Sequence, residues 1–285
     1  MSPEAHGKIL NAQGYCIVRG AIPSAQALAL DRALGPGFEA TPFCEGGFYG
    51  ERTKRFGRLL SRAPETDRLV RHPTILTLAE EMLSPWCDTI QLNLTQAIAI
   101  HPGALSQFPH RDQDMWRGAV GEVEYLVNVM WPLTDYRADN GATLIWPGSH
   151  GVAARADQPE GEPVVAEMKP GDALVFLGST LHGAGGNLSG DIRRGLIISY
   201  CLGWLKPYEN QWLAYPPDVA RHFPRPLAEL VGYRQHRPNL GNYEGRCPSV
   251  LLDGPVDPAL GAIDALRPDQ SLALEAYLAE QRRRD

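Results

Sequence analysis

The sequence predicts a mainly β fold with flanking helices, in which the central part forms an antiparallel sandwich or barrel. Two observations support this prediction. The first is a set of short runs of β-branched or alternating apolar residues, at 89–101, 123–131, 142–146, 163–168, 173–176 and 196–203. The second is the clusters of Gly, Pro, Asn and Asp between these runs, which are typical of tight turns and include residues 138–141, 146–149 and 169–172.

The N-terminal segment, residues 1–88, is predicted to be mainly helical. It opens with a short helix at 8–13, a buried strand at 15–19, and a helix from Pro23 with apolar residues at helical spacing. Residues 36–57 are rich in Gly and charge and show no sustained period, which predicts a long loop that could form a lid over an active site. Two short helices are expected within 63–83, because Pro73 interrupts the apolar pattern there.

The β core is expected to cover about residues 89–205, followed by a C-terminal segment at 206–285. After Trp204 this segment is Pro-rich and irregular, and it closes with a helix around 268–284 that has an apolar side. No stretch resembles a linker between domains, so the simplest interpretation is one domain over residues 1–285.

Composition limits the class of protein. A formal net charge of −6 argues against a nucleic-acid partner, because affinity for nucleic acid comes largely from Lys and Arg. The start of the chain lacks the features of a signal peptide, and no apolar run approaches the ~20 residues of a membrane-spanning helix. We therefore expect no membrane contact and a cytoplasmic location. Five scattered cysteines without a Cys-x-x-Cys pair predict reduced thiols. The oligomeric state stays open, with a homodimer as one option.

His110 and Asp112 form the first candidate metal-binding motif. Residues two apart in an extended segment point to the same side, so both side chains could bind one metal ion. Taken alone, one His-x-Asp pair is weak evidence in a chain with eight histidines. His182, which follows the run at 172–177, could supply a third ligand. Two imidazoles and one carboxylate leave three positions of an octahedral ion open, as in Fe(II) oxygenases.

Arg193 lies eleven residues after His182, at the start of the next predicted strand. A guanidinium group can bind a carboxylate through two parallel hydrogen bonds, and 2-oxoglutarate carries such a group far from its metal-chelating end. The neighbouring Arg194 is the alternative partner, although strand alternation allows only one of the two to face inward.

Several motifs occur in a fixed order along the chain, namely 107–112 (Gln-Phe-Pro-His-Arg-Asp), 131–135, 139–143 with 147–150, 169–172, and 182–187 followed by Arg193. In this order and spacing the chain resembles the phytanoyl-CoA dioxygenase-like (PhyH) family of 2-oxoglutarate/Fe(II)-dependent oxygenases, above all its branch that tailors small molecules. The resemblance implies a double-stranded β-helix (jelly-roll, cupin-like) core. It also implies Fe(II) on His110, Asp112 and His182, and 2-oxoglutarate on Arg193, assisted by Thr143 and Gln107.

The activity that the resemblance implies is an O2-dependent oxidation of a small organic metabolite, above all a hydroxylation, with release of succinate and CO2. Desaturation, epoxidation and ring closure remain open as outcomes. Because Asp112 is present, halogenation is not expected. Two other classes use the same ligands: a cupin-like hydrolase or isomerase with Zn or Mn, and a non-catalytic sensor of 2-oxoglutarate and metal. The first of these leaves Arg193 without a role.

Some of these residues have alternative structural roles. Thr143 could equally bond a neighbouring strand, and Gln107 could orient His110. Trp116, Phe48 and Tyr49 are candidates for the wall of a substrate pocket, although large aromatic residues are more often part of the core. Arg55 belongs to a short basic stretch at 52–58 and is a candidate for binding a substrate group.

Overall fold

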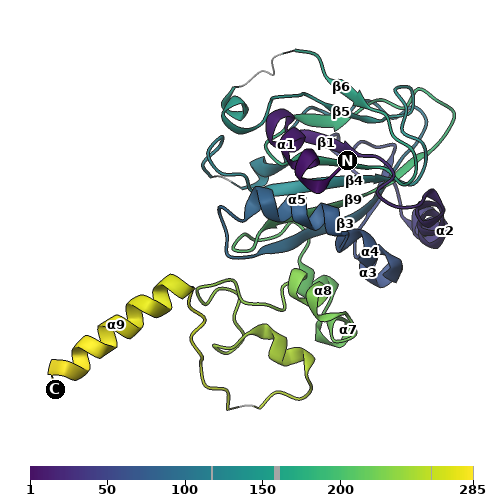
Figure 1. The fold of residues 1–285 in the computed structure, drawn as a ribbon. Helices are drawn as coiled ribbons and strands as arrows, with labels where there is room; N and C mark the ends of the chain where they lie inside the picture. Colours follow the sequence, from purple (N-terminus) through teal and green to yellow (C-terminus); the bar gives the residue numbers. More distant parts are fainter. Residues whose placement is uncertain (117, 157–160, 258, 285) are drawn as a thin grey trace.

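A computed structural model describes residues 1–116, 118–156, 161–257 and 259–284, and its core consists of two antiparallel β-sheets (Figure 1). The larger sheet has the strand order β1-β7-β4-β9-β3-β2. Its strands are β1 (Tyr15–Val18), β7 (Ala173–Leu177), β4 (Leu126–Pro132), β9 (Arg193–Leu202), β3 (Ile90–Ile100) and β2 (Thr53–Phe56). The smaller sheet has the order β6-β5-β8, with β6 (Val164–Ala166), β5 (Thr143–Ile145) and β8 (His182–Ala184).

Two hydrophobic clusters lie on opposite faces of the larger sheet. One fills the space between the sheets and joins side chains such as Leu174 and Ile197 of the larger sheet to Ile145 of the smaller. The other lies between the larger sheet and the helices and includes Leu196 and Ile198 of β9. Because successive strand residues point to opposite faces, β9 contributes to both clusters. The predicted mainly β fold with flanking helices is therefore confirmed.

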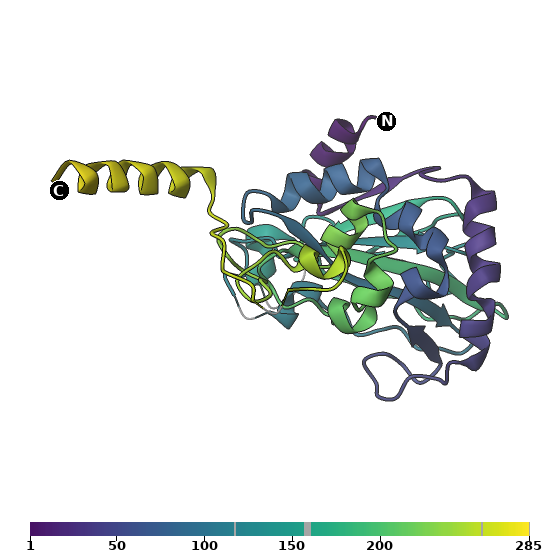
Figure 2. The ribbon, with the colours of Figure 1, turned by 90° about the horizontal axis from the view of Figure 1, so that it is seen from below.

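Helices from the N-terminal segment cover the outer face of the larger sheet (Figures 1 and 2). They are α1 (Pro3–Gln13), α2 (Ser24–Ala40), α3 (Leu59–Arg62), the 3-10 helix η1 (Pro64–Thr66), α4 (Asp67–Val70) and α5 (Pro73–Leu83). Local sequence sets their ends. Ser2 caps α1 with its hydroxyl, and Gly14 ends that helix in the left-handed conformation, with φ of 78°. Pro73 begins α5, where its missing N–H costs nothing.

The loop predicted at 36–57 is shorter in the structure. Helix α2 continues through Pro36 to Ala40, and β2 pairs with β3 along Thr53–Phe56. The sequence did not predict β2, because this edge strand has the sequence Thr-Lys-Arg-Phe and shows no apolar alternation. What remains between the two elements, residues 41–52, contains the aromatic residues Phe48 and Tyr49.

The C-terminal segment packs only in part against the core. Its helices, as far as the structure describes it, are α6 (Gln211–Ala214), α7 (Pro217–Ala220), α8 (Arg225–Leu230), η4 (Pro248–Leu252) and α9 (Pro268–Arg284). Two 3-10 helices, η2 (Asp112–Met115) and η3 (Gly151–Arg155), lie between strands of the β core. Leu227 and Ala228 of α8 join the outer cluster, whereas α9 extends away from the rest of the chain and buries none of its residues (Figures 1 and 2). Over the described residues, no helix combines the length and the apolar character needed to cross a membrane.

Candidate metal centre

His110, Asp112 and His182 come together at one edge of the smaller sheet. His110 forms an isolated antiparallel bridge with His182 of β8, in which each backbone N–H donates to the other carbonyl, at 2.9 and 3.0 Å. This bridge places the two imidazole rings 4.4 Å apart, measured between centroids. Arg111 is extended, and Asp112 begins η2 directly after it, so the carboxylate returns to the same side as His110.

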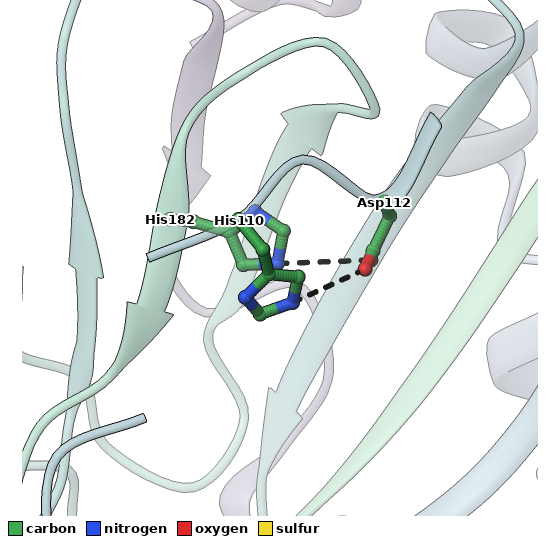
Figure 3. Close-up of side chains that lie close together, drawn as sticks. All are labelled: His110, Asp112 and His182. Atoms are coloured by element: carbon green, nitrogen blue, oxygen red, sulfur yellow. Dashed lines mark ion pairs between the residues drawn. The ribbon is translucent and has the colours of Figure 1, made fainter. Parts of the chain in front are cut away.

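The three side chains point toward one another, as Figure 3 shows. Nε2 of His110 lies 3.3 Å from Oδ1 of Asp112, and Nε2 of His182 lies 3.6 Å from Oδ2. One ligand atom from each residue lies within 4.8 Å of the other two, and no second group of this kind occurs in the described part of the chain. The spacing suits a single metal ion held between them.

Backbone carbonyls orient both imidazoles. Nδ1 of His110 is 2.9 Å from the carbonyl oxygen of Phe108, and Nδ1 of His182 is 3.1 Å from that of Thr180. A proton on each Nδ1 would donate to these carbonyls, which leaves the lone pair of each Nε2 directed at the centre of the group. This is the tautomer that a metal ligand needs.

The charges in the group also suit a metal ion. Burial alone would raise the pKa of Asp112, but His182, His110 and Arg55 outweigh that effect and hold it at about 2. Burial lowers the pKa of His182 to about 4. Near neutral pH the group is therefore a carboxylate with at least one neutral imidazole, and ligands in these protonation states bind metal without first losing a proton.

Asn128 of β4 holds the carboxylate from the larger sheet. Its side-chain amide donates to Oδ2 of Asp112 at 3.0 Å, and the residue is fully buried. An amide in an otherwise apolar strand is a signal that the sequence carries, since buried polar residues usually have a partner. The partner itself could not be predicted, because it depends on how β4 lies relative to η2.

Arg193, at the start of β9, is buried between the sheets with 1 % of its surface exposed. Its Nη2 lies 3.5 Å from Oγ1 of Thr143 on β5, and its Cζ lies 3.8 Å from the ring centroid of Tyr136. Across the described residues, no carboxylate is within salt-bridge distance of it, and its Nε has no hydrogen-bond partner. A buried cation without a counter-ion is costly, so this position favours an anionic ligand.

Arg194 points to the opposite side of β9. Its Nη1 is 3.4 Å from both carboxylate oxygens of Asp31 on α2, outside the space between the sheets. Strand alternation thus separates the two arginines.

Arg55 of β2 is a second guanidinium near the triad. Its Nη1 donates to Oε1 of Gln96 at 3.2 Å, its Cζ lies 5.0 Å from the ring centroid of Tyr49, and its buried Nε has no partner. The charge of Arg55 is the smallest of the influences that lower the pKa of Asp112, after His182 and His110, so Arg55 lies in the neighbourhood of the triad. In the described chain Arg55 forms no salt bridge within 4.0 Å.

The loop at 41–52 contributes the aromatic side chains next to the triad. The ring of Phe48 lies 4.9 Å from that of His110, and the hydroxyl of Tyr49 is hydrogen-bonded to that of Tyr208. Gln107 donates to the carbonyl of Phe48 at 3.3 Å and accepts from the backbone N–H of Ala184 at 3.4 Å. Gln107 therefore ties this loop to β8, while Phe108 is the residue that orients His110.

Trp116 lies on another side. It stacks with Tyr125 at 6.4 Å, donates its Nε1 proton to the carbonyl of Lys206 at 2.9 Å, and packs against the outer hydrophobic cluster. Of the candidates for a substrate pocket, Phe48 packs against His110, Tyr49 contacts Phe48 and Arg55, and Trp116 lies against the outer hydrophobic cluster. Tyr136 and Tyr208, which sequence reasoning did not single out, lie beside Arg193 and Tyr49 respectively.

Comparisons with known proteins agree on one family. Residues 10–195 match the family model described as phytanoyl-CoA dioxygenase (PhyH). The dioxygenase cdmD of Talaromyces verruculosus is 33% identical over 196 residues, which is 65% of this chain and 63% of that protein, less than two thirds of its length. The dioxygenase olcK of Penicillium canescens is 29% identical over 248 residues, which is 82% of each chain.

A solved structure resembles the fold. It is the epimerase SnoN from nogalamycin biosynthesis, in complex with Fe3+, alpha ketoglutarate and nogalamycin RO. It aligns with a TM-score of 0.57 and 20% identity, over 71% of this chain and 84% of that chain. This likeness confirms the predicted double-stranded β-helix core.

Proposed function

The chain belongs to the phytanoyl-CoA dioxygenase family of Fe(II)- and 2-oxoglutarate-dependent dioxygenases, and from this premise we propose that it hydroxylates a small organic molecule. Succinate and CO2 would be the other products. The observation that carries the proposal is Arg193, a buried guanidinium without a counter-ion, in a space that also holds a preformed group of two imidazoles and a carboxylate. A Zn- or Mn-dependent hydrolase or isomerase that uses no 2-oxo acid would have no use for that arginine.

His110, Asp112 and His182 would hold the iron. Their oriented Nε2 atoms and ionised carboxylate match the donor set of non-haem Fe(II) sites with open positions. When bound, the iron supplies the activation of O2 coupled to oxidative decarboxylation of 2-oxoglutarate. The contribution of the protein is to position the reactants and to exclude water.

2-Oxoglutarate has a carboxylate at each end, and the site has two guanidinium groups. We assign the distal carboxylate to Arg193 with the hydroxyl of Thr143, since both are buried and face each other. Arg55 is a further guanidinium whose buried Nε has no partner and whose charge acts on Asp112, which favours a co-substrate role. The alternative is the substrate role expected from the sequence. Affinity for 2-oxoglutarate in Arg55→Gln, measured without substrate, separates the two.

The rim of the site supports a small molecule with apolar parts as substrate. Phe48 and Tyr49 lie against or near His110, and about half the surface of Phe48 is exposed at 49%. Aromatic walls with a few polar groups are the usual lining of such pockets. The ligand in the SnoN complex, nogalamycin RO, agrees with this size class. We do not expect a nucleic-acid partner, given the net charge of −6.

A cytoplasmic location is part of the proposal. The five cysteines are free thiols, two of them buried. Burial raises the pKa of Cys16 to about 12 and that of Cys201 even further, so these two thiols are poorly reactive. Free thiols in this number are typical of a reducing compartment.

The test is an anaerobic titration of metal-free protein with Fe(II) and then 2-oxoglutarate. We expect the visible charge-transfer band of a chelated 2-oxo acid in the parent protein and its loss in His182→Ala. Arg193→Gln should need at least about thirtyfold more 2-oxoglutarate, because removing one partner of a buried charge pair costs 2–5 kcal/mol. Arg194→Gln is the matched control and should titrate like the parent.

Each alternative function has its own signature in this experiment. A protein that binds Fe(II) without any charge-transfer band would be a metal-dependent hydrolase or isomerase. A band without succinate release under O2, across a panel of small molecules, would indicate a sensor. Succinate release that a small molecule stimulates supports the dioxygenase.

A further inference from the structure

The C-terminal helix α9 has no partner within the described part of its own chain. It runs over Pro268–Arg284, extends away from the sheets and helices, and buries none of its residues (Figures 1 and 2). It nevertheless carries large apolar side chains, among which Leu272 is 67% and Tyr277 59% exposed. Most of the stability of a helix in a protein comes from tertiary packing of its apolar face. A partner outside the chain would bury the apolar side chains that α9 leaves exposed.

One side of α9 is suited to contact a partner. Leu274 and Leu278 are one turn apart and therefore lie on the same face, with Tyr277 next to them. At about 100° per residue, Leu272 falls on the opposite face. Glu275 lies beside Leu278 around the helix and borders this apolar face.

An apolar cleft of about 420 Å³ lies on the body of the same chain. Its walls include Trp204, Trp212 and Leu240, which are between 42% and 50% exposed. Hydrogen bonds fix both indoles, since Trp204 donates to the carbonyl of Trp86 at 3.0 Å and Trp212 to that of Gly232 at 3.2 Å. Exposed aromatic side chains held in place are typical of binding surfaces.

One acidic residue of α9 can pair with basic residues at the rim of the cleft, whereas the arginines of α9 are confined to its last turn. Lys206 and Arg234 line the cleft and are both exposed. Glu275, next to the apolar face of α9, has the opposite charge. With Leu274 and Leu278 in the cleft, this glutamate would lie near its basic rim, and such pairs fix the orientation of a docked helix.

The root of α9 is fixed beside the cleft. Ala265 donates its N–H to the side chain of Asn239 at 2.9 Å, and Asn239 donates its own N–H to the carbonyl of Ala265 at 3.2 Å. Asn239 directly precedes Leu240 in the cleft wall, and residues 266–267 alone separate this root from α9. From this root α9 points away from the body of the chain, so its apolar face does not reach the cleft of its own chain (Figures 1 and 2).

We propose that α9 docks into the aromatic cleft of a second copy of this chain, while the second copy returns its own α9. Because each helix starts next to a cleft, a twofold arrangement brings each α9 to the other chain's cleft and forms every contact twice. The face formed by Leu274 and Leu278 contacts the cleft. The assembly is a homodimer joined by its exchanged C-terminal helices.

The first test is the mass of the full-length protein in solution by size-exclusion chromatography with light scattering. We expect twice the 31.3 kDa of one chain. The double variant Leu274→Asp, Leu278→Asp and the cleft variant Trp212→Glu should each be monomeric, with the circular dichroism of the parent. Leu272→Asp, on the opposite face of α9, is the matched control and should stay dimeric.

Mixing the two monomeric variants tests the exchange itself. The intact α9 of the cleft variant can enter the intact cleft of the helix variant, so the mixture should form dimers that neither variant forms alone. Three results would overturn the proposal: a monomeric parent, a dimer that survives all the substitutions, or a mixture that stays monomeric. None of these measurements needs iron or 2-oxoglutarate, so their outcome is independent of the proposed activity.

Discussion

At the scale of single residues, Asn128 holds the carboxylate of the proposed metal centre by one hydrogen bond. Its amide donates to Oδ2 of Asp112, which also lies 3.6 Å from Nε2 of His182. Without that bond the carboxylate can rotate, and the three ligand atoms lose their fixed separation. Partners of metal ligands commonly contribute about 10–100-fold in metal affinity.

We therefore expect Asn128→Ala to weaken Fe(II) binding by at least about tenfold, measured by competition with a chelator. Ser199→Ala is the control, because Ser199 lies opposite Asn128 in the register of β4 and β9 and bonds Asn93 instead of the triad. Equal metal affinity in Asn128→Ala and the parent would show that the hydrogen bond does not hold the carboxylate in place.

The sequence could predict the triad and Arg193 as candidates, because the order and spacing of their motifs along the chain are specific. It could not predict Asn128, Tyr136 or Tyr208. Each of these touches the site through a contact between distant segments, and such contacts depend on strand register and loop path. Arg55 was a candidate only as part of a basic stretch, while its place near the triad follows from the pairing of β2 with β3.

At the scale of elements, β9 joins the proposed co-substrate site to the hydrophobic core. Arg193 begins the strand, and Gly195, two residues later, faces the same side and packs under Tyr136. A Cβ at Gly195 would collide with the hydroxyl of Tyr136 and lie 3.0 Å from the carbonyl of Trp131. Tyr136 in turn covers the guanidinium of Arg193 at 3.8 Å. The strand therefore needs glycine here for space.

Gly195→Ala should displace the ring of Tyr136 from the guanidinium group of Arg193. We expect unfolding to become easier by about 1–3 kcal/mol, as is usual for overpacking, together with a lower affinity for 2-oxoglutarate. Urea unfolding and the anaerobic titration measure the two effects. Gly190→Ala is the control, since a Cβ there meets no atom within 4 Å. A variant as stable as the parent would mean that Tyr136 has room to move.

Strands with strong patterns were predictable, and two short ones were not. The runs that became β3, β4, β7 and β9 alternate or are continuously apolar, because they lie in the larger sheet between two hydrophobic clusters. Strand β8 consists of His-Gly-Ala and is defined by its pairing with β5. Strand β2 is a charged edge strand. Both form because neighbouring strands supply hydrogen bonds, the long β3 for β2 and the equally short β5 for β8, and local sequence does not reveal such pairing.

At the scale of the whole molecule, the candidate site bridges the two sheets. His182 and Thr143 belong to the smaller sheet, whereas Asn128 and Arg193 belong to the larger. Iron and 2-oxoglutarate would each contact groups that depend on both sheets. A ligand that binds only the folded arrangement stabilises it by mass action.

Fe(II) with 2-oxoglutarate should therefore raise the melting temperature more than Fe(II) alone. At a hundredfold excess over the dissociation constant the gain is about 2.7 kcal/mol, or roughly 5–10 °C for a chain of this size. Anaerobic thermal unfolding measures it, and His182→Ala should lose the response. An unchanged melting temperature of the parent protein would indicate that Fe(II) and 2-oxoglutarate do not bind groups from both sheets.

The aromatic residues at the edge of the candidate site come from other segments of the chain than the residues expected to bind iron and 2-oxoglutarate. Phe48 and Tyr49 lie in the segment between α2 and β2, and Tyr208 follows β9, so all three are outside the strands that carry Arg193, Thr143 and His182. Substitutions in these segments can alter which molecule enters without disturbing the groups expected to bind iron and 2-oxoglutarate. Gene duplication followed by divergence of two short connections would thus be enough to give a descendant enzyme a new substrate while it keeps the ancestral reaction.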